Sequence, residues 1–206
     1  MAVLDHLVLA TPRLEETVED IAGRLGETPA PGGRHVGLGT RNHLLGLGRG
    51  AYLEIVGPDP EQPEPEFPRP FGIDSLDRAS IVTWAVRTDD IEGAVSSARS
   101  VGRDPGDVRP MSRKTPGGDL LSWRLTLDED GTHSGVVPFL IDWGSTPHPS
   151  RGLPVVPLES LEVTHPAPSE AEKSLRALGV GQTVTEGARP ALVARLSTES
   201  GSVILT

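Results

Sequence analysis

The chain has 206 residues, a formal net charge of −10 at pH 7 and no cysteine. The acidic balance argues against nucleic-acid binding, which depends on Lys and Arg contacts to phosphate. The absence of cysteine excludes disulfides, thiolate nucleophiles and cysteine-ligated zinc. Glycine (24 residues) and proline (20 residues) are abundant, so many turns and short strands are expected.

The first 57 residues have the pattern of a strand, a helix and three further strands. The apolar run 4–10 predicts a strand, and Thr11-Pro12 after it is typical of a helix start. Apolar residues then recur at helical spacing up to Gly26, which ends the helix. Short apolar segments separated by glycine-containing turns predict three strands at 34–38, 42–48 and 51–56.

The same order of features returns twice further along the chain, at residues 81–102 and 158–179. The glycines that end the three predicted helices, Gly26, Gly102 and Gly179, are 76 and 77 residues apart. A repeat at such regular spacing indicates one supersecondary unit used several times. Three strands are again expected after each helix, at 108–111, 120–127 and 136–143 in the second unit and at 183–186, 192–197 and 202–205 in the third.

The helices of the later units carry start signals of their own. Asp89 with Glu92 resembles a capping box, and Ser169 with Glu172 has the full pattern. We therefore expect a first unit over 1–57, a proline-rich linker over 58–79, a second unit over 80–144, a second linker over 145–157 and a third unit over 158–206. Because prolines exclude helix and central strand, the first linker is expected to be an extended surface crossing.

This repeated unit resembles the vicinal oxygen chelate superfamily, which includes glyoxalase I, extradiol dioxygenases and bleomycin-resistance proteins. The chain is most similar to the glyoxalase-like group. The resemblance implies an α+β fold in which curved, mostly antiparallel sheets enclose a small-molecule cleft, often with a divalent metal. It covers nearly the whole chain and lies in ordered motifs: LDH at 4–6, PGGRH at 31–35, GTRN at 39–42, YLEI at 52–55, WRL at 123–125, PFLIDW at 138–143 and HP at 148–149.

Three residues are candidates for a metal site under this resemblance. His6 matches a metal ligand on the first strand, Glu54 matches a ligand on the last strand of the unit, and Asp142 is taken as its counterpart in unit two. Both carboxylates lie in apolar strands, where a charge is costly unless it faces water, a cation or a donor. The three would bind Zn, Ni, Mn or Fe, and a carboxylate free of metal, Glu54 or Asp142, would move a proton.

The second unit weakens the metal hypothesis. Thr83 stands 77 residues after His6, where a second histidine would complete a four-ligand set. A half-buried structural role for His6 and a solvent-facing position for Glu54 therefore stay open as alternatives.

A second group of candidates would contact a small-molecule ligand directly. The polar, glycine-rich segment 33–42 carries His35, Arg41 and Asn42, and Arg124 lies in an apolar strand. Arginine can fork onto a carboxylate or phosphate, whereas His35 and Asn42 could orient a carbonyl. The alternative is a solvated hairpin.

Other notable residues have plainer interpretations. We interpret Arg109, Arg113 and Lys114 as a solvated basic face, and Trp143 as a core residue.

Two functions remain open from the sequence. One is a metal-dependent lyase, isomerase or dioxygenase that acts on vicinal oxygens; the other is a metal-free module that binds a metabolite or drug. No Gly-x-Gly-x-x-Gly or Walker motif supports a nucleotide cofactor. Without a signal-peptide pattern or a long apolar run, we expect a cytoplasmic protein without membrane or nucleic-acid partners, and a homodimer is one arrangement that the repeats allow.

Overall fold

The computed structural model describes residues 2–127 and 135–206. The first unit contains β1 (Val3–Ala10), α1 (Leu14–Leu25), β2 (Ala30–His35), β3 (Thr40–Gly48) and β4 (Ala51–Pro58). The second contains β5 (Ser80–Arg87), α2 (Ile91–Ser100), β6 (Asp107–Lys114), β7 (Leu120–Leu127) and β8 (Phe139–Asp142). The third contains β9 (Leu158–His165), α3 (Pro168–Ala177), β10 (Val184–Glu186), β11 (Ala191–Thr198) and β12 (Gly201–Leu205).

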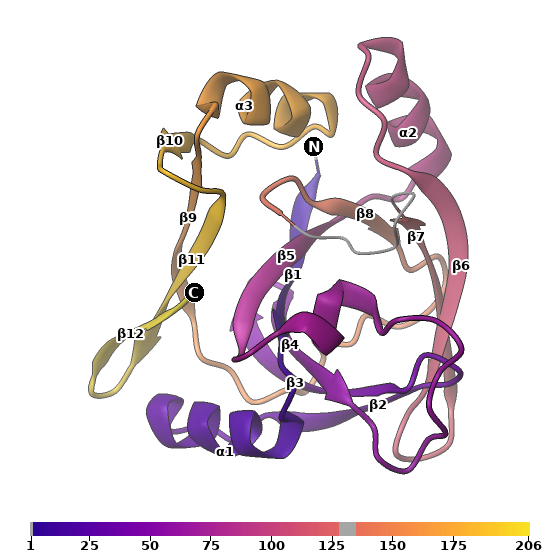
Figure 1. Cartoon of the computed structure of the whole chain (residues 1–206), viewed down its shortest axis with the longest axis vertical. Helices are drawn as coiled ribbons and strands as arrows, with labels where there is room; N and C mark the ends of the chain where they lie inside the picture. The colour runs from indigo at the N-terminus through magenta and orange to yellow at the C-terminus, as the bar shows by residue number, and fades with distance from the viewer. Residues whose placement is uncertain (1, 128–134) are drawn as a thin grey trace.

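The first two units together form one closed barrel, with strand order β1-β4-β3-β2-β6-β7-β8-β5 (Figure 1). Within each unit the first and last strands pair in parallel, and the other pairings are antiparallel. The units join at two seams, where β1 pairs with β5 and β2 pairs with β6. The predicted α+β fold of repeated strand-helix-three-strand units is therefore confirmed.

The β2–β6 seam depends on a glycine. Gly33 has φ of +150°, and a Cβ atom added there would lie 2.0 Å from the carbonyl oxygen of Lys114. No side chain fits in that space, so the two strands approach this closely because residue 33 is glycine.

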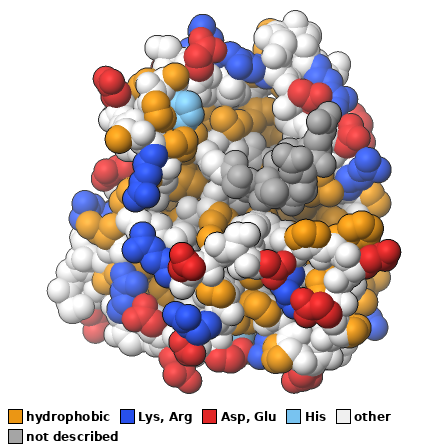
Figure 2. Space-filling view, in the orientation of Figure 1, with side chains coloured by type: hydrophobic (Ala, Val, Ile, Leu, Met, Phe, Trp, Pro, Cys, Tyr) orange, Lys and Arg blue, Asp and Glu red, His pale blue; other side chains and the backbone are white. Residues whose placement is uncertain are grey.

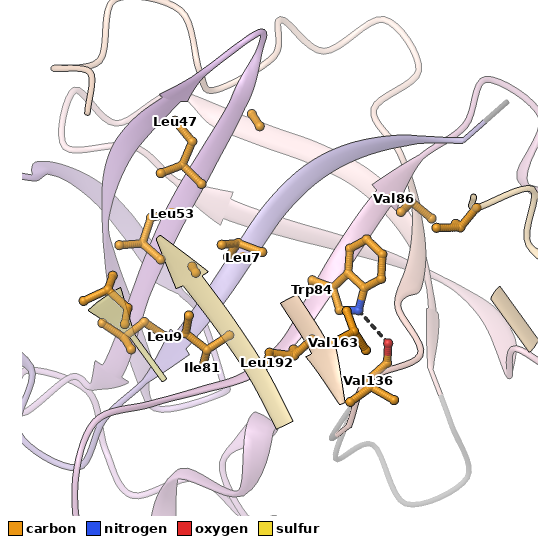
Figure 3. Close-up of a cluster of buried hydrophobic side chains, with 14 of the residues drawn as sticks. Leu7, Leu9, Leu47, Leu53, Ile81, Trp84, Val86, Val136, Val163 and Leu192 are labelled. Carbon is orange, nitrogen blue, oxygen red and sulfur yellow. Dashed lines mark hydrogen bonds between the residues drawn. The ribbon is translucent and has the colours of Figure 1, made fainter. Parts of the chain in front are cut away.

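The third unit forms a separate four-stranded sheet, ordered β10-β9-β11-β12, which stands beside the barrel (Figure 1). Its apolar face covers the outside of the first strands of both barrel units (Figure 3). There Val163 and Leu192 share one buried cluster with Leu9, Ile81 and Trp84. The inward side chains of the barrel strands form a second cluster, which surrounds the candidate site.

Three local expectations were wrong. Asp90, not Asp89, caps α2, and its Oδ1 accepts a hydrogen bond from the amide of Gly93 at 3.0 Å. Ser169 does not cap α3, because the helix begins at Pro168 after Ala167, and Glu172 instead accepts a hydrogen bond from the amide of Val184 at 3.2 Å. The first linker is not simply extended: a 3₁₀ turn, η1 (Pro70–Ser75), lies within it and packs against the barrel interior.

Surface charge is mixed on the face shown in Figure 2, where acidic and basic side chains are interspersed. Across residues 2–127 and 135–206, no helix has the length and apolar character needed to cross a membrane.

Candidate functional site

A cavity lies inside the barrel, between the inward faces of its strands and the turn η1. Its enclosed part has a volume of about 70 Å³, and the total is about 630 Å³ when the space at its open mouth is included. Alternation along each strand aims every second side chain inward, and here those side chains are large and mostly apolar. The aromatic and sulfur-containing ones are Tyr52, Phe71, Met111, Trp123, Phe139 and Trp143.

One part of the wall is polar and centres on Glu54. Its Oε1 accepts a hydrogen bond from Asn42 Nδ2 at 2.5 Å and lies 3.8 Å from His35 Nε2. Its Oε2 lies 3.5 Å from His6 Nε2. The structure therefore brings together four of the candidate residues, all of which are buried and line the cavity.

Asp5 orients the imidazole of His6 by contacting Nδ1, the ring nitrogen that faces away from Glu54. Asp5 Oδ1 lies 2.7 Å from His6 Nδ1, and Oδ2 accepts hydrogen bonds from Trp143 Nε1 at 3.1 Å and His148 Nε2 at 2.9 Å. Burial alone would raise the pKa of Asp5, but the hydrogen bonds from His148 and His6 outweigh it and hold that pKa well below its ordinary value. Because an ionised carboxylate can only accept, His6 Nδ1 carries a proton and Nε2 faces Glu54.

Two neighbouring rings complete the surroundings of this cluster. Tyr52 stacks on His6 with ring centroids 4.7 Å apart, and burial raises its pKa well above the ordinary value, so its hydroxyl stays protonated. Burial lowers the pKa of His35, against the attraction of Glu54, and the charge of Arg113 lowers it further. His35 Nδ1 lies 3.0 Å from the hydroxyl of Thr40.

Arg113 is the cation of the cavity wall, which corrects its interpretation as part of a solvated face. It is the buried position of β6, with 4% of its surface exposed, and it donates a hydrogen bond to the carbonyl of Gly32. The other two members of the proposed basic face, Arg109 and Lys114, are exposed as expected.

Asp142 and Arg124 lie elsewhere. They are partners across β7 and β8, form an ion pair with each other and line a separate surface cavity. Trp143 belongs to the buried inner cluster, as expected of a core residue, and it also lines the barrel cavity. The structure therefore does not bring Asp142 to His6 and Glu54.

The register explains why Asp142 is not the counterpart of Glu54. Glu54 pairs with Val8 of β1, and the residue 77 positions after Val8 is Ala85, which pairs with Phe139. Phe139 is thus the repeat equivalent of Glu54, and its ring lies edge-on to His6 with centroids 5.5 Å apart.

Arg41 also lies outside the cavity. Its guanidinium donates to Glu15 of α1 at 2.6 Å and lies 3.7 Å from Asp59. Its local role is therefore to tie β3 to the neighbouring helix and loop.

The donor set does not fit a divalent metal of the kind that the superfamily often uses. His6 and Glu54 form one half of such a site, but the repeat supplies Thr83 and Phe139 in the other half. Over the described ranges, no group of three or more His, Asp or Glu side chains is arranged to hold an ion. A stable site needs at least three protein ligands.

These features define a class of protein: a barrel of paired strand-helix-three-strand units with an aromatic cavity and a polar cluster inside it. The family model of the glyoxalase-like domain matches residues 4–179. The chain belongs to this family.

The chain is similar to solved structures at low sequence identity. A hypothetical protein from Staphylococcus aureus is 15% identical with a TM-score of 0.63, over 93% of this chain and 88% of that one. Methylmalonyl-CoA epimerase from Mycobacterium tuberculosis is 20% identical with a TM-score of 0.44, over 70% of this chain and 88% of that one. A search of curated proteins found no match.

Sequence reasoning missed four residues of the site: Asp5, Tyr52, Arg113 and His148. Asp5 directly precedes His6. Tyr52 and Arg113 stand two residues from Glu54 and Met111, a strand spacing that places each pair on the same side. His148 lies in the second linker, so its contact with Asp5 depends on the folded chain.

Proposed function

We propose that this protein binds a small, mainly aromatic molecule in the barrel cavity without a metal ion. The observation that carries the proposal is the composition of the wall, which joins aromatic side chains to one polar cluster. Such a combination is typical of ligand sites, where apolar contacts supply affinity and a few polar groups fix orientation.

The polar cluster would orient the ligand. Glu54 keeps acceptor capacity beyond its bond from Asn42, since a carboxylate has about four lone-pair sites. Tyr52 adds a protonated hydroxyl to the wall. An aromatic ligand that carries an oxygen or nitrogen atom would pack against the apolar wall and hydrogen-bond to the polar cluster.

Proton transfer at the bound molecule is a second candidate function. The contact between Asp5 and His6 favours this function. In many catalytic sites a carboxylate orients the histidine that acts as the base, and Asp5 holds His6 in the same way. His6 and Glu54 would then exchange a proton with the ligand. With 2-acetylnaphthalene in D₂O, the protein would accelerate deuterium uptake by the methyl group over a protein-free blank, and His6→Gln would abolish the acceleration. An unchanged rate in that variant would contradict the assignment.

The three tryptophans provide the test of binding. Trp123 and Trp143 line the cavity, whereas Trp84 lies in the outer cluster with its Nε1 bonded to the carbonyl of Val136 (Figure 3). Fluorine-labelled tryptophan should give three resonances, assignable with single Trp→Phe variants. On titration with 2-acetylnaphthalene, we expect saturable shifts of the Trp123 and Trp143 signals and none of Trp84. Equal shifts of all three, or none, would contradict the proposal.

A further inference from the structure

Arg113 is a buried charge without a matching partner. Its guanidinium has one hydrogen bond, to the carbonyl of Gly32, and in the described part of the chain no carboxylate lies within ion-pair distance. Burial lowers the pKa of Arg113, and the charge of Glu54 only partly opposes this. An uncompensated buried cation is among the most costly groups a protein can hold.

Neighbouring arginines differ from Arg113, because each of them forms an ion pair with a carboxylate. On the same strand, Arg109 pairs with Asp107 at 3.2 Å, and on the next strand Arg124 pairs with Asp142 and Glu92. Across the seam, Arg34 pairs with Glu61. Only the cavity-lining member of this group has a backbone carbonyl as its sole partner within the described residues.

The nearest carboxylate of the cavity is already surrounded by other groups. Glu54 accepts from Asn42 and lies beside both His6 and His35. These contacts hold the Glu54 carboxylate in the polar cluster, where it forms no ion pair with Arg113. The remaining N–H donors of Arg113 are therefore available for another anion. A guanidinium offers five N–H donors in a planar fork, and the carbonyl of Gly32 takes only part of them.

We infer that the cavity selects an aromatic molecule with a carboxylate, and that Arg113 binds this group. The inference rests on the proposed function and names the class of its ligand. A carboxylate matches the planar fork of arginine, and it would give the guanidinium of Arg113 the direct anionic partner that it lacks among the described residues. The ring would lie against Trp123 and Trp143, and the Glu54 cluster would face its other polar groups.

The test compares two ligands of nearly the same shape, 2-naphthoate and its neutral methyl-ketone analogue 2-acetylnaphthalene, by calorimetric titration. Wild-type protein should bind the naphthoate about tenfold more tightly, since a charge-assisted pair replaces a neutral contact. Arg113→Met should weaken naphthoate binding about tenfold and leave ketone binding within about twofold. Arg109→Met, an exposed arginine on the same strand, should bind both ligands as the wild type does.

The possible failures are distinct. If wild-type protein binds the ketone as tightly as the naphthoate, the inference is overturned whatever the variant does. Preference for the naphthoate that survives in Arg113→Met also overturns it. Failure of both ligands to bind would contradict the proposed function and this inference with it. Should Arg113→Met fold poorly, Arg113→Lys keeps the charge without the fork, and it should retain a reduced preference for the naphthoate.

Discussion

His6 and Glu54 face each other across two paired strands, with 3.5 Å between Nε2 and Oε2. The same imidazole holds Asp5 through Nδ1 at 2.7 Å. Asp5, His6 and Glu54 therefore form a chain of contacts, and its last member, Glu54, lines the aromatic cavity. Half of a metal site is present here, and the repeat fills the opposite half with Thr83 and Phe139.

Metal analysis should show no stoichiometric divalent ion. In protein purified without chelator and without a nickel affinity step, we expect zinc, nickel, manganese and iron each well below one ion per chain. His6→Ala should leave these contents unchanged, because two ligands are too few to retain an ion. One equivalent of any of these metals, lost in His6→Ala, would refute this part of the account.

Replacement of Asp5 should destabilise the protein at neutral pH. Asp5→Asn removes the charge that accepts from His6, His148 and Trp143, at a cost of about 3 kcal/mol. The native pKa of Asp5 lies below its ordinary value of 3.8. Its contribution is therefore complete above pH 3.8 and is lost as the pH falls through the native pKa.

Urea unfolding at several pH values tests this sign. The gap in unfolding free energy between wild type and Asp5→Asn should be constant from pH 7 to about pH 5 and narrow below pH 3.8. A gap that widens on acidification would show that Asp5 is not stabilised as an anion.

His35 should make the protein less stable in mild acid. Burial lowers its native pKa below the ordinary value of 6.5, so below pH 6.5 the unfolded chain takes up a proton that the native chain does not. Stability is thus complete above pH 6.5 and falls as the pH drops toward the native pKa. His35→Gln, which does not titrate in this range, should lose less stability between pH 7.5 and 5.0 than the wild type. Parallel curves for the two proteins would contradict this role.

Gly33 should be essential to barrel closure. Gly33→Ala places a methyl group against the carbonyl of Lys114 at positive φ, which should cost at least about 1–3 kcal/mol of unfolding free energy. Gly23→Ala is the matched control, because its Cβ would meet nothing within 4 Å inside α1; it should stabilise by about 0.5–1 kcal/mol. Thermal unfolding measured by circular dichroism would rank the stability of the wild type and the two variants. Equal stability of Gly33→Ala and the wild type would show that the β2–β6 seam does not require glycine at position 33.

Periodicity and repeat spacing were enough to predict the strand-helix-three-strand units, whereas the curved sheets around a cleft were predicted from the family resemblance. Apolar stripes and terminal glycines are local signals, so the three units were apparent in the chain, and a charge inside the apolar strand of Glu54 correctly marked an inward position. Asp142 carries the same signal, yet it faces outward because its charge is balanced by Arg124 across the sheet. The free-energy cost of a charge in an apolar strand predicts that the charge has a polar environment. It does not tell whether that environment is a cavity or a cross-strand ion pair when the strand register is unknown.

The remaining site residues depend on long-range structure. Arg113 is buried only because β6 closes the barrel against β2, and Phe71 reaches the cavity only because the proline-rich linker folds back over it. His148 meets Asp5 from 143 positions away. Strand spacing after Met111 indicates only which side of β6 Arg113 faces, and the approaches of Phe71 and His148 leave no periodic trace in the sequence.

The most direct test of the central claim is a crystal structure of the protein with bound 2-naphthoate. The account predicts the naphthalene ring inside the barrel against Trp123 and Trp143, with Glu54 and His6 at the polar end and the carboxylate on Arg113. A ring bound on the outer surface, or a cavity that stays closed to the compound at saturating concentration, would contradict it.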